Sequence, residues 1–170
     1  MSGMSPTIGK TDGKYYIELS FAPSMSLVTI VRRFVSGFFD LVLDDPGLTA
    51  KLAVTVHELL ENAVKFSRDG DAFIRVALSP EDPRTVEIET RNRASAEETG
   101  TLQTLFDEIT AAASPMDFYV ARMERSLDAD RSQLGLARVL VEAGMELTYE
   151  TKDELVYVYA KRPLHEAANA

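Results

Sequence analysis

The chain contains 170 residues, of which 45% are hydrophobic and 26% charged, and its formal net charge is −9. This length fits one domain with a substantial hydrophobic core. The acidic balance argues against nucleic-acid binding, which needs a surplus of basic side chains to neutralise phosphates. The sequence has no cysteine, which excludes disulfides, thiolate metal ligands and a cysteine nucleophile and fits a reducing compartment such as the cytoplasm.

The first part of the chain predicts a strand followed by two helices. Residues 1–13 are polar, contain glycine and proline and lack the apolar core of a signal peptide, so we expect a flexible start and a cytoplasmic protein. Residues 14–22 have strand composition, and residues 25–45 and 49–67 carry apolar side chains at helical spacing. No apolar run reaches the roughly 20 residues that cross a bilayer, so no membrane contact is expected.

The second part predicts two strands, a helical region, one more helix and a closing hairpin, in the segments 71–80, 84–92, 97–127, 132–144 and 145–163. Ser114 and Pro115 are expected to break the helical region, and residues 164–170 to form a flexible tail. Grouped helices and grouped strands favour an α+β fold, a two-layer sandwich whose mixed, mostly antiparallel sheet is covered by helices on one face. We expect a single domain over residues 14–163.

The stretch "TVHELLENAVKFS" (55–67) places polar side chains within an apolar helical pattern. Its "HELLE" is similar to the zinc-binding HExxH helix, in which two histidines four residues apart meet one ion. Here the second position is Glu61, and the other histidine of the chain, His165, lies in the tail. A phosphoacceptor histidine is the next alternative, but such sites lie on helical bundles without strands. We therefore interpret His57 as a partly buried helix residue.

Glu58, Asn62 and Lys65 share one face of this predicted helix. A carboxylate, an amide oxygen and an ammonium group on one face can polarise a water, ligate Mg²⁺ and meet a phosphate. The same spacing also fits a solvated helix face with an ion pair between Glu61 and Lys65. The helix alone leaves both interpretations open.

The neighbouring sequence resembles a known family. The segments "APSMSLVTIVRRFV" (22–35) and "LTAKLAVTVHELLENAVKFS" (48–67) resemble the opening of bacterial anti-sigma-factor serine kinases, in the GHKL (Bergerat-fold, HATPase_c-like) ATPase superfamily. Glu58, Asn62 and Ala63 match the E-x-x-x-N-A motif of that family. Further along, "VEIETRN" (86–92) is similar to the strand that delivers its adenine-binding residue, and "SQLGLARVL" (132–140) to its GLGLA phosphate loop.

The resemblance implies ATP and Mg²⁺ as cofactors and assigns a role to each matching residue. Glu58 would be the catalytic base or the carboxylate that orients a water, Asn62 the Mg²⁺ ligand and Lys65 a phosphate contact. Asn92 would accept a hydrogen bond from the adenine amino group. Gly135 and Leu136 would form part of the phosphate loop.

The sequence departs from the family pattern at both glycine-rich segments. The adenine strand of the family ends in Asp-x-Gly-x-Gly, whereas here "RNRAS" (91–95) places Asn92 at the Asp position, with no glycine before Gly100. An amide oxygen accepts a hydrogen bond more weakly than a carboxylate does. In the second segment, Gln133 replaces a glycine that would expose backbone N–H groups to phosphate.

The helical segment 102–127 takes the place of the family's ATP lid. Together with Asn92, this layout resembles a divergent branch that includes SiaB-type regulatory kinases. The resemblance implies a bacterial partner-switching protein that binds Mg·ATP, sequesters a sigma factor or other target and phosphorylates a serine of a small antagonist protein. It also implies a homodimer, for which the apolar flank of the first helix is a candidate interface. The missing glycines favour an alternative, a degenerate GHKL-fold interaction module without ATP turnover.

Overall fold

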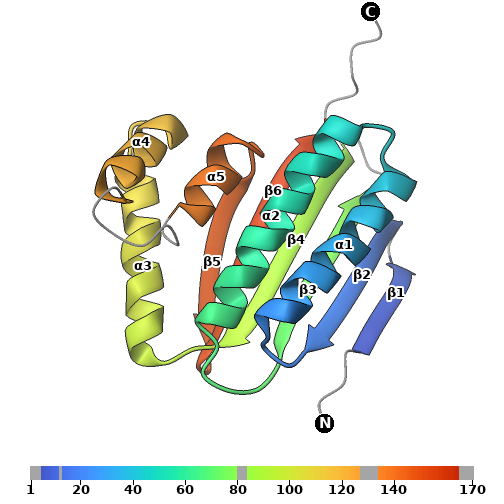
Figure 1. The fold of residues 1–170 in the computed structure, drawn as a ribbon, viewed down its shortest axis with the longest axis horizontal. Helices are drawn as coiled ribbons and strands as arrows, with labels where there is room; N and C mark the ends of the chain where they lie inside the picture. Colours follow the sequence, from blue (N-terminus) through green and yellow to red (C-terminus); the bar gives the residue numbers. More distant parts are fainter. Residues whose placement is uncertain (1–4, 12, 80–83, 127–133, 165–170) are drawn as a thin grey trace, which may run out of the picture.

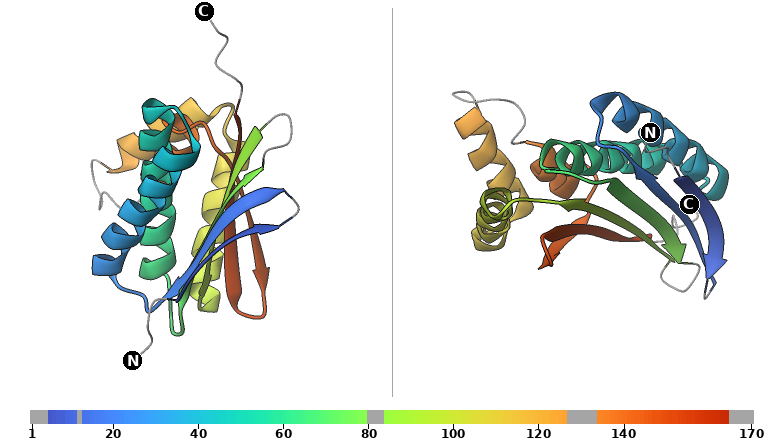
Figure 2. Two further views of the ribbon diagram at one scale, coloured as in Figure 1. Left: turned by 90° about the vertical axis from the view of Figure 1, so that its right-hand side faces the viewer. Right: turned by 90° about the horizontal axis from the view of Figure 1, so that it is seen from below.

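The computed structural model describes residues 5–11, 13–79, 84–126 and 134–164. Within these ranges, five helices and six strands form two layers (Figure 1). The strand order is β1-β2-β3-β4-β6-β5, and every neighbouring pair is antiparallel. The view from below in Figure 2 shows the helices on one face of the sheet, with the other face open. The predicted α+β sandwich is confirmed, with a fully antiparallel rather than mixed sheet over the described strands.

The elements follow one another along the chain as β1 (Ser5–Thr11), β2 (Lys14–Phe21), α1 (Met25–Val42), α2 (Pro46–Lys65), β3 (Ala72–Ser79), β4 (Arg84–Arg93), α3 (Ala96–Ala111), α4 (Pro115–Ser126), α5 (Gly135–Val141), β5 (Glu146–Lys152) and β6 (Leu155–Leu164). Among these helices, none combines the length and the apolar character that crossing a membrane would need.

The N-terminal strand β1 corrects the prediction of a flexible start at residues 1–13. Residues Ser5–Thr11 pair antiparallel with β2, with Ile8 opposite Ile17. The sequence "SPTIGKT" contains proline and glycine and lacks apolar alternation, so local pattern does not identify it as a strand. Its hydrogen bonds come from β2, which is why only the assembled sheet reveals it. Most of the expected tail, residues 165–170, lies outside the described residues.

Helix boundaries follow from capping groups. The side chain of Asp45 accepts a hydrogen bond of 2.9 Å from the backbone N–H of Leu48, and Pro46 occupies the first turn, so α2 begins three residues earlier than predicted. The predicted break between two helices is confirmed, because Ser114 accepts from the backbone N–H of Asp117 at the start of α4. The two-residue turn at Asp153 and Glu154 has positive φ at both positions and closes the predicted hairpin.

The hydrophobic core lies between the sheet and the two long helices. Alternate residues of β2 and β3 point into it, and α1 and α2 each contribute one buried stripe, with the largest fully buried side chains Phe21, Phe39, Ile17, Leu19, Leu52, Leu59, Leu60, Ile74 and Ile88. Burial of each such side chain contributes about 1.5–3 kcal/mol. Because one stripe of α2 faces the sheet and α1 covers one side, the opposite side of α2 faces α5 and α3 (Figure 1).

Two backbone hydrogen bonds hold the end of β4 beside α2. Arg68 N–H donates to the carbonyl of Arg93, and Ala94 N–H donates to the carbonyl of Glu154, both at 2.9 Å. The first bond connects the chain after α2 to the last residue of β4. The second connects the β5–β6 hairpin to the residue that follows β4. The position of Asn92, one residue before Arg93, is therefore determined from both sides.

Candidate functional site

A cleft runs between α2 and α3, with β4 and β6 as its floor. Its inner pocket is lined from α2, β4, α3, α5 and β6 by mainly apolar side chains, including Leu136, together with the amides of Asn62 and Asn92. Its outer pocket is lined by Asn62, Lys65, Phe66, Thr101, Leu102, Leu105, Arg122 and Leu136. The two pockets are parts of one cleft, because they share the lining residues Asn62, Phe66, Thr101, Leu102, Leu105 and Leu136.

The structure brings four of the predicted site residues to this cleft. Asn62 and Leu136 line both pockets, Asn92 lines the inner one and Lys65 the outer one. The cavity volume is about 50 Å³ in the inner pocket and about 260 Å³ in the outer pocket. The inner pocket therefore has room for a few waters, whereas the outer pocket accommodates a larger polar group.

Asn92 is buried, with 5% of its surface exposed, and its amide orientation follows from its neighbour. Its Nδ2 donates a hydrogen bond of 2.9 Å to the backbone carbonyl of Phe66. Because a carbonyl only accepts, the NH₂ group must face Phe66. The amide oxygen therefore remains the acceptor that Asn92 can offer to a ligand in the inner pocket.

The segment after Asn92 begins a helix at the place where the resemblance predicts a glycine-rich loop. Ser95 caps α3: its Oγ accepts from the N–H of Glu98 at 3.2 Å, and the Glu98 carboxylate accepts from the N–H of Ser95 at 2.7 Å. The chain thus passes from β4 directly into a capped helix instead of a glycine loop. The Glu98 carboxylate, which lines the inner pocket, is engaged in this cap.

Asn62 and Lys65 extend from the same side of α2. No hydrogen bond from the described residues reaches the Asn62 side chain, so its amide is available to a ligand where the two pockets meet. Lys65 is exposed, and its ammonium lies 5.6 Å from the centre of the Phe66 ring. Glu61, the alternative partner considered for Lys65, instead lies 3.5 Å from Nε2 of His57.

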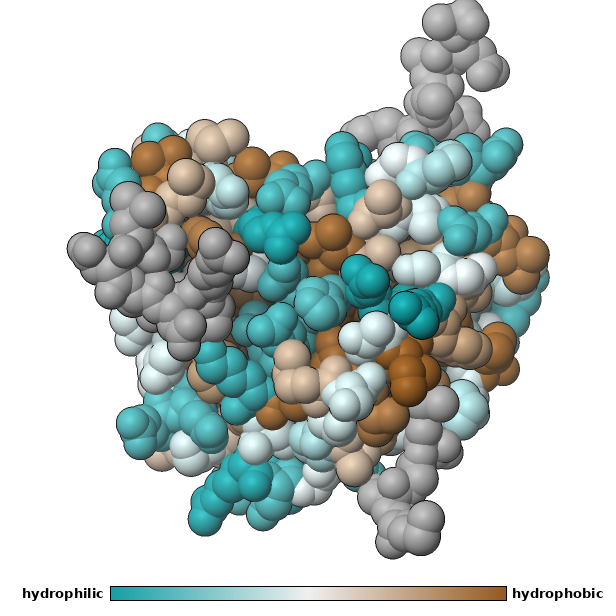
Figure 3. Space-filling model, viewed as in Figure 1, coloured by the Kyte–Doolittle hydropathy of each residue, from teal (hydrophilic) through white to brown (hydrophobic). Residues whose placement is uncertain are grey.

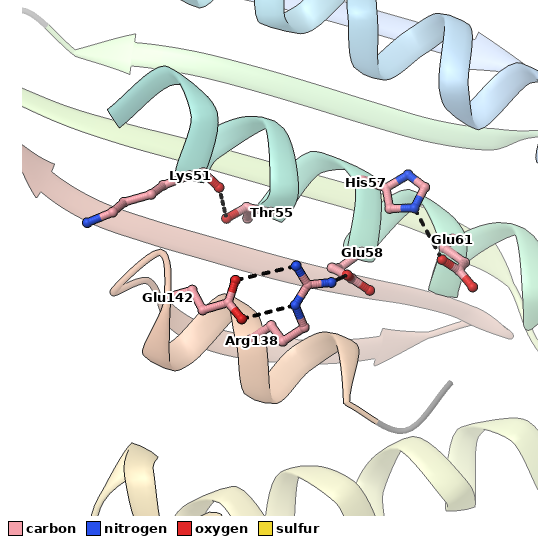
Figure 4. A network of polar contacts seen from close by, with 7 residues as sticks. All are labelled: Lys51, Thr55, His57, Glu58, Glu61, Arg138 and Glu142. Atoms are coloured by element: carbon pink, nitrogen blue, oxygen red, sulfur yellow. Dashed lines mark hydrogen bonds and ion pairs between the residues drawn. The ribbon is translucent and has the colours of Figure 1, made fainter. Parts of the chain in front are cut away.

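The Glu58 carboxylate is held by an arginine that the sequence motifs did not identify. Nη1 of Arg138 donates to Oε1 of Glu58 at 2.6 Å, and the same guanidinium contacts Glu142 at 3.1 Å (Figure 4). The Glu58 side chain is only 12% exposed. Arg138 lies 80 positions from Glu58 in the chain, and its only sequence signal was its place one turn after Gly135.

Gly135 and Glu58 lie against each other beside the cleft. A Cβ atom at Gly135 would come 2.6 Å from Oε2 of Glu58, so any side chain at position 135 would displace this carboxylate. The glycine therefore permits the close approach of α5 to Glu58. The predicted contact of Gly135 with phosphate stays a prediction. In this conformation the Glu58 carboxylate, which lies against the start of α5, would repel a phosphate. Gln133, the other departure in this segment, lies outside the described residues.

Burial raises the pKa of the Glu58 carboxyl above its usual range, although Arg138 and His57 act in the opposite direction. A carboxyl group with a raised pKa is a stronger base than an exposed one. However, the hydrogen bond to Arg138 occupies one of its oxygens. The geometry therefore gives Glu58 the basicity that proton transfer needs but not yet a free approach to a substrate hydroxyl.

Metal binding at the cleft would depend on Asn62 and on ligands that accompany the metal. Among the described residues there is no group of three His, Cys, Asp or Glu side chains arranged to hold an ion. Mg²⁺ often binds through one protein oxygen, several waters and substrate phosphates, and the unbonded Asn62 amide fits that mode. The zinc alternative lacks support in the described chain, and His57 is a partly buried helix residue as predicted.

Replacing Arg138 tests the Glu58 contact. The Arg138→Met variant loses the positive charge beside Glu58, so the pKa of Glu58 rises further. The variant is therefore destabilised at pH values at which Glu58 is ionised. We expect a loss of about 1–3 kcal/mol at pH 8 and a smaller loss at pH 4, where less of the carboxyl is ionised. Urea unfolding at both pH values measures this difference.

The matched control for this experiment is Glu142→Gln, which removes the exposed contact on the other side of the same guanidinium. It should change stability by less than about 0.5 kcal/mol. If Arg138→Met lost equal stability at pH 4 and pH 8, the arginine would act through packing and not through the Glu58 charge.

Asn92→Asp tests the orientation of the amide. The new carboxylate would place an oxygen against the Phe66 carbonyl, and we expect a loss on the order of 3 kcal/mol at pH 7.5. At acid pH the protonated carboxyl can donate to that carbonyl, so the loss should shrink. Asn92→Leu, which removes the donor without adding charge, should lose stability equally at both pH values. A fully stable Asn92→Asp protein at pH 7.5 would show that the amide does not face Phe66.

Comparisons with known proteins relate this fold to solved structures. No family model and no curated protein matches the sequence. The fold is similar to that of a chain in the crystal structure of the SiaB–SiaC complex from Pseudomonas aeruginosa, with a TM-score of 0.59 and 15% sequence identity. The match covers 85% of this chain and 89% of the other. The protein therefore shares its α+β fold with a chain of that complex over most of its length.

Proposed function

We propose that the protein is a GHKL-type regulatory protein that binds Mg·ATP in the cleft between α2 and α3 and acts in a bacterial partner-switching pathway. One observation carries this proposal: Asn92 is anchored to Phe66 through its NH₂ group and so offers an acceptor oxygen to an otherwise apolar pocket beside Asn62. The fold shared with a chain of the SiaB–SiaC complex supports a role in association with a protein partner.

The two pockets suit the two ends of a nucleotide. The apolar inner pocket suits a flat base, whose amino group would donate to the Asn92 oxygen. The outer pocket, with Lys65 at its margin, suits phosphates, and Asn62 lies where a phosphate-bound Mg²⁺ could reach its amide oxygen. The inner pocket is small, so we infer that α3 moves away from α2 when a base enters.

Phosphoryl transfer would require Glu58 to accept the proton of a serine hydroxyl on the antagonist protein. ATP supplies the transferred phosphoryl group, and the chain's own contribution is to orient the hydroxyl and take its proton. The bond between Glu58 and Arg138 favours a second candidate, a module that binds nucleotide and protein partners without turnover. Kinase activity would require that partner binding release Glu58 from Arg138.

Nucleotide binding is tested by thermal and urea unfolding with and without Mg·ATP. At a hundredfold excess over the dissociation constant, we expect a stabilisation of about 2.7 kcal/mol. Asn62→Ala should lose the Mg²⁺-dependent part of this gain while its stability without ligand stays near that of the wild type, since no described residue bonds to the Asn62 side chain. A large loss of stability without ligand would identify Asn62 as a structural residue instead.

Transfer is then separated from binding with γ-labelled ATP and a candidate antagonist protein. Glu58→Gln should bind ATP and transfer phosphate about 10²–10⁴-fold more slowly, the range of general acid–base contributions. Equal rates in both proteins would remove Glu58 from the mechanism. Nucleotide binding without transfer by the wild type to any candidate antagonist would favour the binding module.

The outward flank of α1 supports a homodimer as part of this proposal. Four large apolar side chains on this helix are exposed, namely Met25, Ile30, Phe34 and Leu41. Figure 3 shows hydrophobic surface over the region where α1 lies in Figure 1. Ile30, Phe34 and Leu41 follow at spacings of four and seven residues, so they form one stripe along the helix. Such a stripe on a monomer marks an interaction surface.

We expect Phe34→Glu to convert a dimer into a monomer, measured by light scattering of the eluting protein. The charge would have to be buried in the interface without a partner, which costs several kcal/mol. Thr29→Glu, which adds the same charge to an exposed position of α1 away from the stripe, should leave the dimer intact. A wild-type protein that elutes as a monomer at tens of micromolar would contradict the homodimer.

A further inference from the structure

The outer pocket contains a cation that no motif predicted. Arg122 extends from α4 into the lining of this pocket, and its side chain is only 11% exposed. Nη2 contacts Oε2 of Glu108 on α3 at 3.1 Å, and the guanidinium carbon lies 5.5 Å from the centre of the Phe118 ring. The carboxylate and the ring hold the guanidinium in one place, so it is preorganised rather than a mobile surface charge.

The charges around the outer pocket favour an anion. Its lining contains the cations Lys65 and Arg122 and, among the described residues, no carboxylate. Glu108, which contacts Arg122, also contacts Arg125 at 3.0 Å, so its charge is shared between two guanidinium groups. Lys65 and Arg122 therefore bring two cations to one pocket, although the whole chain has a net charge of −9. A local positive region in an acidic protein attracts an anionic ligand.

The start of α5 cannot serve the same purpose in this conformation. The Glu58 carboxylate lies against Gly135, at the position where the resemblance places the phosphates. A phosphate there would meet a negative charge at close range. Leu136, the next residue, lines the outer pocket, where Lys65 and Arg122 approach from α2 and α4.

We propose that the outer pocket is a polyphosphate site in which Arg122 from α4 and Lys65 from α2 clamp the ligand's phosphates. The guanidinium of Arg122 is planar and has the geometry that matches phosphate oxygens, and Lys65 adds a second charge from another helix. The placement of an adenine base in the inner pocket rests on the proposed function, whereas the phosphate clamp depends only on these two cations. The helices that replace the lid thereby take part in ligand binding.

Isothermal titration with three probes tests the clamp: inorganic pyrophosphate, ADP and adenosine, all at one ionic strength. Arg122→Met and Lys65→Met should each weaken pyrophosphate and ADP binding about tenfold, the usual effect of losing a charged hydrogen bond. Adenosine affinity should not change, because adenosine carries no phosphate. Arg122→Lys keeps the charge and should retain more affinity than Arg122→Met.

Two matched controls separate the pocket from general surface charge. Arg125→Met removes a cation of the same helix that contacts the same Glu108 but is 60% exposed and outside the pocket lining. Lys51→Met removes an exposed lysine of α2 that does not line the pocket. Both variants should bind pyrophosphate within twofold of the wild type. Because Lys65 is exposed, its variant should fold normally even if Arg122→Met loosens α4.

The outcomes distinguish this inference from the proposed function. If Arg122→Met and Arg125→Met weakened pyrophosphate binding equally, the clamp would be overturned. ADP binding that is unchanged by both Arg122→Met and Lys65→Met would overturn the clamp while nucleotide binding stands. Pyrophosphate binding that depends on Arg122, in a protein that binds no ADP or adenosine, would support the clamp and overturn nucleotide binding. If the wild type binds neither pyrophosphate nor ADP, both are wrong.

Discussion

The burial of one stripe of α2 against the sheet is the constraint on which the site depends. Leu52, Val56, Leu59 and Ala63 are buried on this stripe, and together they fix the rotation of the helix about its axis. A helix turns about 100° per residue, so fixing the apolar stripe also fixes where every polar residue points. Glu58, Asn62 and Lys65 must then lie on the side that faces α5 and the cleft. Rotation of α2 would expose several large side chains, each at a cost of about 1.5–3 kcal/mol.

Charge divides this side of α2 into two regions. At Glu58 the chain places one guanidinium between two carboxylates, so the positive charge of Arg138 is neutralised within the protein. Two turns further on, Lys65 has no carboxylate partner among the described contacts and lines a pocket with Arg122. The first region links α2 to α5 through the contact between Glu58 and Arg138. The second region brings cations from two different helices to one pocket.

The helices α3 and α4 give the cleft its outer wall. The capping box at Ser95 starts α3 directly after β4, and the contact of Phe106 with Tyr149, with ring centres 4.5 Å apart, holds α3 against β5. A wall made of helices is held by packing and by its caps, whereas a glycine-rich loop is held mainly by its ligand. The cleft is therefore preformed in its outer part and narrow in its inner part. Under the proposed function, a base enters the inner part when α3 moves away from α2.

Periodicity and local capping determined much of this protein from sequence alone. The helical spacing of apolar residues predicted α1 and α2, the alternation around Lys152 and Asp153 predicted the closing hairpin, and the spacing of Glu58 and Asn62 placed both on one helix face. These features depend on residues within a few positions of one another. The tertiary structure alone decided the pairing of β1 with β2, the contact between Glu58 and Arg138, the hydrogen bond from Asn92 to Phe66 and the entry of Arg122 into the outer pocket. Except for the β1–β2 hairpin, each of these joins residues far apart in the chain, and their distance depends on how whole helices and strands pack. In β1 the local pattern is too weak to identify a strand, and its hydrogen bonds exist only once β2 is in the sheet.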